Sequence, residues 1–135
     1  MKKNIFYLIF IVTVSLQASS YAVVVHQNSH ISKLSKKQIK DIFLKKRHFI
    51  KEIQLIPVNI ASRLRLRREF ETKILKINRA KLNRYWVKKH FQGISPPLTQ
   101  SSTRSMKLFI KNVKGAIGYL PLTQIDSELK VLYEF

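Results

Sequence analysis

Strand-like and helix-like hydrophobic patterns alternate along residues 23–135, and no other feature restricts the fold as strongly. Short runs of β-branched and other apolar residues predict strands at residues 23–26, 53–58, 115–120 and 130–133. Apolar residues three and four positions apart predict helices at residues 35–44, 64–77, 78–93 and 102–113. Strands joined by helices of this length require crossover connections, so the pattern predicts the α/β class, with a mostly parallel sheet flanked by helices.

Polar residues at the starts of three of these helices are of the types that cap helices. Ser35 and Gln38 have the spacing of a capping box, in which each side chain bonds the backbone N–H of the other residue. Asn78 and Ser102 precede the third and fourth predicted helices, and each can accept a hydrogen bond from the first turn. The caps therefore support the helix starts predicted from hydrophobic spacing.

The first part of the chain has the pattern of a secretory signal peptide. A cationic start is followed by the apolar run Ile5–Val12 and then by small residues that end at Ala22. This order predicts a leader at residues 1–22, cut after Ala22, and one domain at residues 23–135. A membrane anchor is the alternative, but polar residues interrupt the run before the roughly 20 apolar residues that a spanning helix needs. We therefore expect a periplasmic protein with no transmembrane segment after cleavage.

The chain carries 26 lysine and arginine residues against 7 aspartate and glutamate residues, a formal net charge of +19. Such an excess attracts anions over long distances, which makes phosphate, nucleic acid and anionic polymers candidate partners. The alternative is a solvated, lysine-rich surface, because net charge by itself says nothing about chemistry. The sequence contains no cysteine, which excludes disulfides, a thiol nucleophile and a cysteine-ligated metal.

The histidines do not form a recognisable catalytic or metal site. His26 and His30 are four residues apart, but the pattern around them is a strand entering a loop, with no acidic ligand nearby. His48 and His90 stand among cations without a carboxylate partner, which argues against general acid–base catalysis. We expect no metal, no cofactor and no enzymatic activity.

Aromatic and basic residues are interleaved in the third predicted helix, as they are on surfaces that bind nucleic acid. Tyr85, Trp86 and Phe91 are the aromatic residues, and Lys88 and Lys89 lie between them. At helical spacing, large aromatic residues more often belong to the core. We therefore expect a structural helix here and no nucleic acid partner.

Several short motifs occur in a fixed order along residues 23–135. They are Leu34-Ser35, Ile42-Phe43-Leu44-Lys45-Lys46, Pro57-Val58-Asn59, Tyr85-Trp86 and Gly115-Ala116-Ile117-Gly118-Tyr119. With Arg67 and Phe70, this order resembles the small phosphate-binding-protein-like chains of the periplasmic solute-binding superfamily, although Lys45 stands where that family has a glycine. The resemblance implies one lobe of a type II periplasmic binding protein. It also implies phosphate or a similar oxyanion as ligand and an ABC permease or another envelope protein as partner.

The chain departs from that family at the positions that hold the anion. In the family, the loop after the Pro-Val pair carries an arginine and an aspartate, followed by a Ser-Gly-Thr triplet at the helix start. By the spacing from Pro57 to Phe70, these positions correspond to Ile60 and Ser62 and then to residues 64–66, which are Leu-Arg-Leu. The usual ligands are therefore absent, and the chain is long enough for one lobe only.

Cationic and hydroxyl-bearing residues near the predicted strand ends remain as candidate anion ligands. Arginine binds phosphate or sulfate bidentately, and a helix start offers unpaired N–H groups. We expect the loops after the first strand and before the last helix to meet at the same edge of the sheet. The candidate ligands are Asn28, Ser29, Ser62, Arg63, Arg65, Arg67, Ser101 and Ser102.

Two of these candidates have a plain structural alternative, and the function stays open at this stage. Arg67, with Arg68, can pair with Glu71 on a solvated basic face, and Ser102 can serve only as a helix cap. One hypothesis is an exported solute-binding-like domain that binds an oxyanion as part of an ABC-type uptake system. The other is an envelope interaction module that has lost the solute and docks on an acidic protein or an anionic polymer. A secreted ribonuclease has only the charge in its favour.

Overall fold

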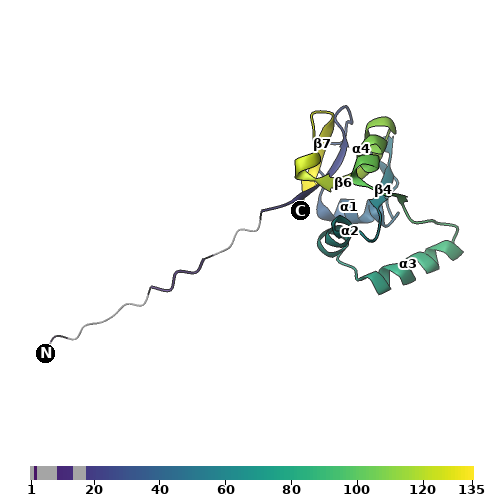
Figure 1. Ribbon diagram of the computed structural model, residues 1–135. Coiled ribbons are helices and arrows are strands. Elements are labelled where there is room, and N and C mark those ends of the chain that lie inside the picture. Colours follow the sequence, from purple (N-terminus) through teal and green to yellow (C-terminus); the bar gives the residue numbers. More distant parts are fainter. Residues whose placement is uncertain (1, 3–8, 14–17) are drawn as a thin grey trace.

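The computed structural model describes residue 2, residues 9–13 and residues 18–135 (Figure 1). The start of the predicted leader and part of its apolar run lie outside the described residues. None of the helices in the described ranges is long and apolar enough to span a membrane. Regular structure begins at Tyr21, two residues before the predicted start of the domain.

A five-stranded sheet forms the centre of the fold (Figure 1). Its strands lie in the order β5 (Leu98–Gln100), β4 (Ile56–Ile60), β6 (Ala116–Pro121), β1 (Tyr21–His26) and β7 (Leu129–Glu134). β4 is parallel to both β5 and β6, whereas β1 is antiparallel to both β6 and β7. Four strands therefore run in one direction and only β1 runs in the other, which confirms the predicted α/β class with a mostly parallel sheet.

Four α-helices connect or flank these strands. They are α1 (Lys36–Phe43), α2 (Arg65–Phe70), α3 (Arg79–Phe91) and α4 (Thr103–Asn112). α2 continues as the π-helical turn η1 (Glu71–Leu75), and the 3-10 turn η2 (Leu122–Gln124) follows β6. The short strands β2 (Phe49–Ile50) and β3 (Ile53–Gln54) pair in a hairpin. The hairpin and β5 are missing from the sequence prediction, because two or three residues are too few to show a hydrophobic period.

The predicted helix caps are present. Ser35 Oγ accepts a hydrogen bond from the backbone N–H of Gln38 at 3.2 Å, and Gln38 Oε1 accepts one from the backbone N–H of Ser35 at 2.9 Å, which completes the capping box. Asn78 Oδ1 accepts from the backbone of Lys81 at 2.9 Å. Ser102 Oγ accepts from the backbone of Ser105 at 3.1 Å. Local polar side chains therefore define where α1, α3 and α4 begin.

The core lies on both faces of β6. Gly118 faces α4, where a β-carbon would lie 2.5 Å from the sulfur of Met106. Tyr119 points to the opposite face and stacks on Phe70 of α2, with ring centroids 4.0 Å apart. Both rings are fully buried, which stabilises the fold by about 2 kcal/mol for each large apolar side chain. Close packing on this second face holds β6 and α2 together beside the end of β4.

α3 packs less closely on the domain than the other helices do. In Figure 1 it lies at the edge of the molecule, away from the sheet. Leu82 is its one fully buried residue, and the hydroxyl of Tyr85 ties it to the end of α1 by donating to the carbonyl of Leu44 at 2.6 Å. Tyr85 and Trp86 are half-buried and pack against the core, as expected for this pair, whereas Phe91 is 85% exposed.

Candidate functional site

Two hollows lined by described residues lie at opposite ends of the sheet. The first, of about 620 Å³, lies at the carboxyl end of β4 and is lined by Asn59, Ser62 and Arg67 on one side and by α3 on the other. We call it the β4–α3 pocket. The second, of about 1090 Å³, lies between the loop after β1, the β2–β3 hairpin and the end of α4. We call it the hairpin pocket.

Asn59 is the most informative residue of the β4–α3 pocket. Its side chain lies in a strand of otherwise apolar residues, and only 5% of the residue is exposed. The hydroxyl of Tyr119 accepts a hydrogen bond from the backbone of Ile60 at 3.2 Å, which leaves its proton to be donated to Asn59 Oδ1 at 2.9 Å. The oxygen of the amide therefore faces Tyr119, and Nδ2, which bonds no other described residue, is left for the pocket.

The hydrogen bond from the Tyr119 hydroxyl to Asn59 Oδ1 persists at all pH values near neutrality. Burial raises the pKa of its hydroxyl well above the ordinary value of 10, although the nearby Arg67 opposes the shift. The hydroxyl therefore stays protonated and continues to donate to Asn59 Oδ1. As a result, the pocket presents a neutral hydrogen-bond donor, not an acceptor, at its buried side.

Two arginines and one glutamate form a partly buried ionic cluster beside Asn59, in which Glu71 and Arg67 are largely buried and Arg79 is exposed. Arg67 Nε lies 2.8 Å from Glu71 Oε1, and Arg79 Nε lies 2.9 Å from Glu71 Oε2. Arg67 also donates from Nη1 to the carbonyl of Ile60 at 2.8 Å, which fixes the guanidinium at the end of β4. One carboxylate faces two cations, so the cluster keeps one net positive charge next to the pocket.

The pairing of Arg67 with Glu71 was the structural alternative at the sequence level, and it is present. Arg68 instead donates to the carbonyl of Arg63 at 3.0 Å and does not join the cluster. Arg67 still lines the pocket, so its ion pair and a contact with a ligand are compatible. The ion pair does, however, reduce the positive charge that Arg67 can offer to an anion.

The loop after β4 and the loop after β5 come together, as the parallel strands require. Arg63 donates from Nη2 to the carbonyl of Ser101 at 3.4 Å, and Ser62 lines the β4–α3 pocket. Arg65 is directed elsewhere: its side chain is 77% exposed and pairs loosely with Glu69 at 3.7 Å. The oxygen of Ser102 is used in the cap of α4. Of the predicted ligands, Ser62 and Arg67 therefore line this pocket, with Arg63 and Ser101 nearby.

Asn28 and Ser29 lie at the other end of the sheet. Because β1 is antiparallel to β6 while β4 is parallel to it, the loop after β1 meets the amino ends of β4 and β6. The expectation that this loop converges with the loop after β4 is wrong. Both residues also take part in local turns: the backbone N–H of Asn28 donates to His26 Nδ1 at 3.1 Å, and Ser29 Oγ accepts from the backbone of Ile31 at 3.2 Å.

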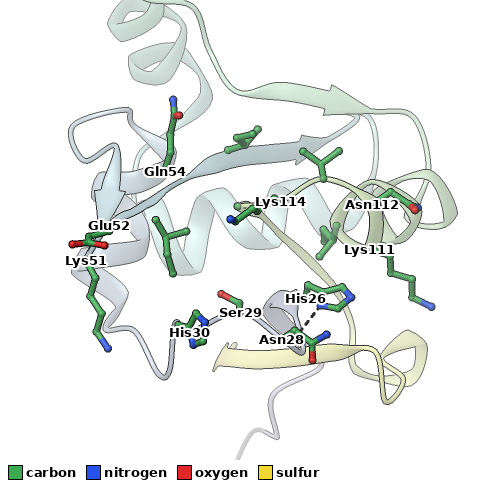
Figure 2. Close-up of a pocket in the computed structure, with 15 residues that line it drawn as sticks. His26, Asn28, Ser29, His30, Lys51, Glu52, Gln54, Lys111, Asn112 and Lys114 are labelled. Atoms are coloured by element: carbon green, nitrogen blue, oxygen red, sulfur yellow. Dashed lines mark hydrogen bonds between the residues drawn. The ribbon is translucent and has the colours of Figure 1, made fainter.

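The hairpin pocket is rich in polar side chains, but they are not directed at a common point. Figure 2 shows Lys51 and Lys111 at its two ends, with their side chains extending away from each other. Lys111 is paired with Asp126 at 2.9 Å and also with Glu128. Within the described residues, no three histidine or acidic side chains are grouped so that they could hold a metal ion. This pocket therefore lacks a constellation that would recognise one small ligand.

Sequence reasoning missed Asn59, Trp86 and His90 as residues of a site. Asn59 was noted only as part of a Pro-Val-Asn motif. An amide inside an apolar strand needs a hydrogen-bond partner, so its presence there could have indicated a polar site. Trp86 and His90 lie one turn apart on α3 and both line the β4–α3 pocket. No local pattern in the sequence indicates that this helix faces the end of β4.

Three solved structures share this architecture. An ABC-type phosphate transport receptor from Vibrio cholerae matches with a TM-score of 0.66 and 17% identity, over 84% of this chain and 45% of that one. A putative phosphate ABC transporter substrate-binding protein with bound phosphate from Clostridium perfringens matches with a TM-score of 0.69 and 19% identity, over 84% and 44%. PstS from Borrelia burgdorferi matches with a TM-score of 0.64 and 10% identity, over 84% and 46%.

No protein-family model and no curated protein matches the chain in sequence. The chain spans less than half the length of the three solved proteins, which agrees with the expectation of one lobe. These neighbours are transport receptors and substrate-binding proteins. The chain therefore has a phosphate-binding-protein-like fold, in the form of a single α/β lobe.

Proposed function

We propose that this protein is an exported solute-binding lobe that holds a small oxyanion, such as phosphate, in the β4–α3 pocket. The observation that carries the proposal is the buried amide of Asn59, whose Nδ2 is held toward the pocket by Tyr119. Among the described residues, no fully buried side-chain donor lacks a partner, so Asn59 Nδ2 reaches the surface of the pocket, where a ligand or water can accept its hydrogen bond. The bound phosphate of the Clostridium perfringens protein, which has the same fold, supports the choice of ligand.

Binding at this site would be weak and of low selectivity. Arg67 offers Nη2, because Nε and Nη1 are engaged with Glu71 and Ile60. The net charge of +19 would raise the local concentration of anions, an effect that added salt screens. An ABC permease or another envelope protein would then receive the solute, as the likeness to transport receptors suggests.

The proposal is tested by thermal unfolding of the exported protein with phosphate or sulfate titrated against chloride at matched ionic strength. Phosphate at a hundred times its Kd is expected to stabilise the fold by about 2.7 kcal/mol. Asn59→Asp keeps an acceptor for Tyr119 but replaces the donor with a negative charge, so it is expected to abolish the shift. Asn28→Asp makes the same chemical change in the exposed loop of the hairpin pocket and is the matched control.

Two results would contradict oxyanion binding. One is the absence of any saturable shift with phosphate in the parent protein. The other is a shift of equal size in the parent and in Asn59→Asp, because the site would then lie elsewhere. If chloride, sulfate and phosphate all stabilise alike, the effect is general screening of a basic protein and not recognition.

An envelope interaction module is the second candidate, and the surface of α3 favours it. Val87 is 60% exposed and Phe91 is 85% exposed, and basic residues lie beside them on the same helix. This combination suits an acidic protein or an anionic polymer better than a small solute. Polymer binding that weakens steeply with salt, in the absence of any effect of phosphate on stability, would support this candidate over the first.

We also propose that export removes residues 1–20, with the cut after Ser20 and not after Ala22. Ala22 is fully buried and is paired with both β6 and β7, so a cut after it would remove the start of β1. The backbone N–H of Tyr21 donates to the carbonyl of Phe135 at 2.9 Å, and the two rings lie 5.5 Å apart. Ala18 and Ser20 supply the small residues that a signal peptidase requires.

The intact mass and N-terminal sequence of the protein recovered from the periplasm test this boundary. We expect the mature chain to begin at Tyr21. A chain that begins at Val23 would show that the original prediction is right and that β1 tolerates the loss of its first two residues. A chain recovered only with its leader attached to the membrane would contradict export by a cleavable signal.

A further inference from the structure

The wall of the β4–α3 pocket opposite Asn59 is mainly apolar, although α3 also contributes Asn83 and His90 to it. α3 contributes Trp86, Val87 and Phe91 to it, and the segment before β5 contributes Pro96 and Pro97. Val87 and Phe91 are large apolar residues with more than half of their surface exposed. Exposed apolar side chains gathered around one hollow are typical of a ligand-binding groove.

The pocket is also larger than an inorganic anion requires. Its volume of about 620 Å³ falls within the roughly 300–1,000 Å³ of sites that hold small organic molecules. The two donors best placed for an anion, Asn59 and the cation Arg67, lie on the side formed by β4 and α2. One end of a ligand would therefore be anionic, and the rest of it would face α3.

The aromatic wall is held in place before any ligand arrives. The rings of Tyr85 and Trp86 pack edge to face with centroids 4.9 Å apart, and Tyr85 is fixed by its hydrogen bond to the carbonyl of Leu44. Lys89 lies 5.5 Å from the centroid of the Tyr85 ring. A flat ring beside Trp86 would gain stacking energy without first having to order that side chain.

On the basis of the proposed oxyanion site, we propose that the ligand is a phosphate monoester that carries an aromatic ring. The phosphate would bind to Asn59 Nδ2 and Arg67, and the ring would lie against Trp86 and Phe91. Inorganic phosphate would then occupy only the polar part of the pocket. The apolar wall would provide both affinity and selectivity.

The test uses Trp86 as a built-in probe, because it is the single tryptophan of the chain. Inorganic phosphate, phenyl phosphate and phenol are titrated separately into the exported protein, and both thermal stability and tryptophan fluorescence are measured. We expect phenyl phosphate to bind at least tenfold more tightly than phosphate and to change the fluorescence of Trp86. Phenol should bind more weakly than phenyl phosphate, because it lacks the anionic group.

Phe91→Ala is the diagnostic variant. Phe91 is 85% exposed, so its truncation should not disturb folding. The preference for phenyl phosphate over phosphate, measured as the ratio of their Kd values, should fall several-fold, with the remainder due to Trp86. Phe49→Ala is the matched control, because Phe49 is 54% exposed in the hairpin and lies outside the pocket. This control should keep the parent ratio.

The outcomes separate this inference from the function on which it rests. Equal binding of phosphate and phenyl phosphate, or an unchanged ratio in Phe91→Ala, would overturn the aromatic ligand and leave oxyanion binding intact. Binding of neither anion would overturn both. Equal binding of phenol and phenyl phosphate would show an apolar site without anion recognition, which would also overturn both.

Discussion

The two pockets lie at opposite ends of one sheet and differ in how their polar groups are used. The hairpin pocket is the larger and is lined by three lysines, yet Lys111 is already paired and the loop residues bond one another. The β4–α3 pocket has fewer cations, but it holds a buried amide with an unused donor. In a strongly basic protein, an amide donor that is oriented by a buried hydroxyl and faces a pocket therefore indicates a site more specifically than a cluster of exposed charges does.

The largest effect that we expect comes from Gly115→Ala at the edge of the hairpin pocket. Gly115 has a φ of +82°, and a β-carbon there would lie 2.1 Å from the backbone oxygen of Gln54. Strain and this clash together should lower the free energy of unfolding by about 3 kcal/mol or more, measured by urea unfolding. Gly93 follows α3 with a φ of +76° and open space around it, so Gly93→Ala should cost only about 1–2 kcal/mol. Equal losses would show that the two ends of the molecule are equally constrained.

The next effect concerns the ionic cluster of the β4–α3 pocket. Glu71→Gln leaves Arg67 and Arg79 without their shared carboxylate, and we expect a loss of about 2–3 kcal/mol in urea unfolding. The same change should strengthen phosphate binding, because Arg67 regains its full charge for the ligand. Glu69→Gln is the control, because Glu69 is a partly exposed carboxylate of α2 that pairs with Arg65 and Lys73 and does not line the pocket. Weaker phosphate binding in Glu71→Gln would mean that the ion pair positions Arg67 for the ligand.

Tyr119→Phe should have a somewhat smaller effect on stability and a clear effect on binding. The change leaves Asn59 Oδ1 and the backbone N–H of Ile60 without their partner, at a cost of about 1–3 kcal/mol. The amide of Asn59 can then turn, so phosphate binding should weaken. Tyr85→Phe removes a hydroxyl that donates to the carbonyl of Leu44, outside the pocket. This change should lower the free energy of unfolding without weakening phosphate binding. An unchanged phosphate affinity in Tyr119→Phe would show that the hydroxyl does not orient Asn59 for the ligand.

The smallest expected effect is a pH dependence next to the hairpin pocket. Hydrogen bonds from Lys107 and Lys111 hold the pKa of Asp126 well below its ordinary value of 3.8. The carboxylate therefore contributes stability that is present above the unfolded pKa and is lost as the pH falls through the folded pKa. Thermal unfolding between pH 2 and 7 should show a smaller acid loss in Asp126→Asn than in the parent. Parallel profiles would mean that these exposed ion pairs contribute nothing measurable.

Much of the fold could be predicted from the sequence because its signals are local. Ser35, Asn78 and Ser102 cap the helices that they precede, and the periodic residues Leu66 and Phe70 are buried as predicted. Lys45 stands where the resembled family has a glycine, and it adopts a φ of +55°, the left-handed conformation that glycine favours. Such features depend on a few neighbouring residues and need no knowledge of the rest of the chain.

The candidate site could be predicted only in part. Ser62 and Ser101 were placed near one edge correctly, because β4 and β5 are parallel neighbours. Asn28 was placed at the wrong end, because the pattern of a strand does not state its direction in the sheet. The exposure of Phe91 was also missed, because helical spacing shows which residues share a face and not what that face contacts.

The sequence alone determined the α/β class, the helix starts and the excess of positive charge, since each follows from local spacing or composition. Only the tertiary structure decided where a ligand could bind. Asn59 and Tyr119 are 60 residues apart in the chain, yet their hydrogen bond orients the amide donor that Asn59 presents to the β4–α3 pocket. That contact forms because β4 and β6 pair side by side, and pairing between distant strands is a property of the whole fold.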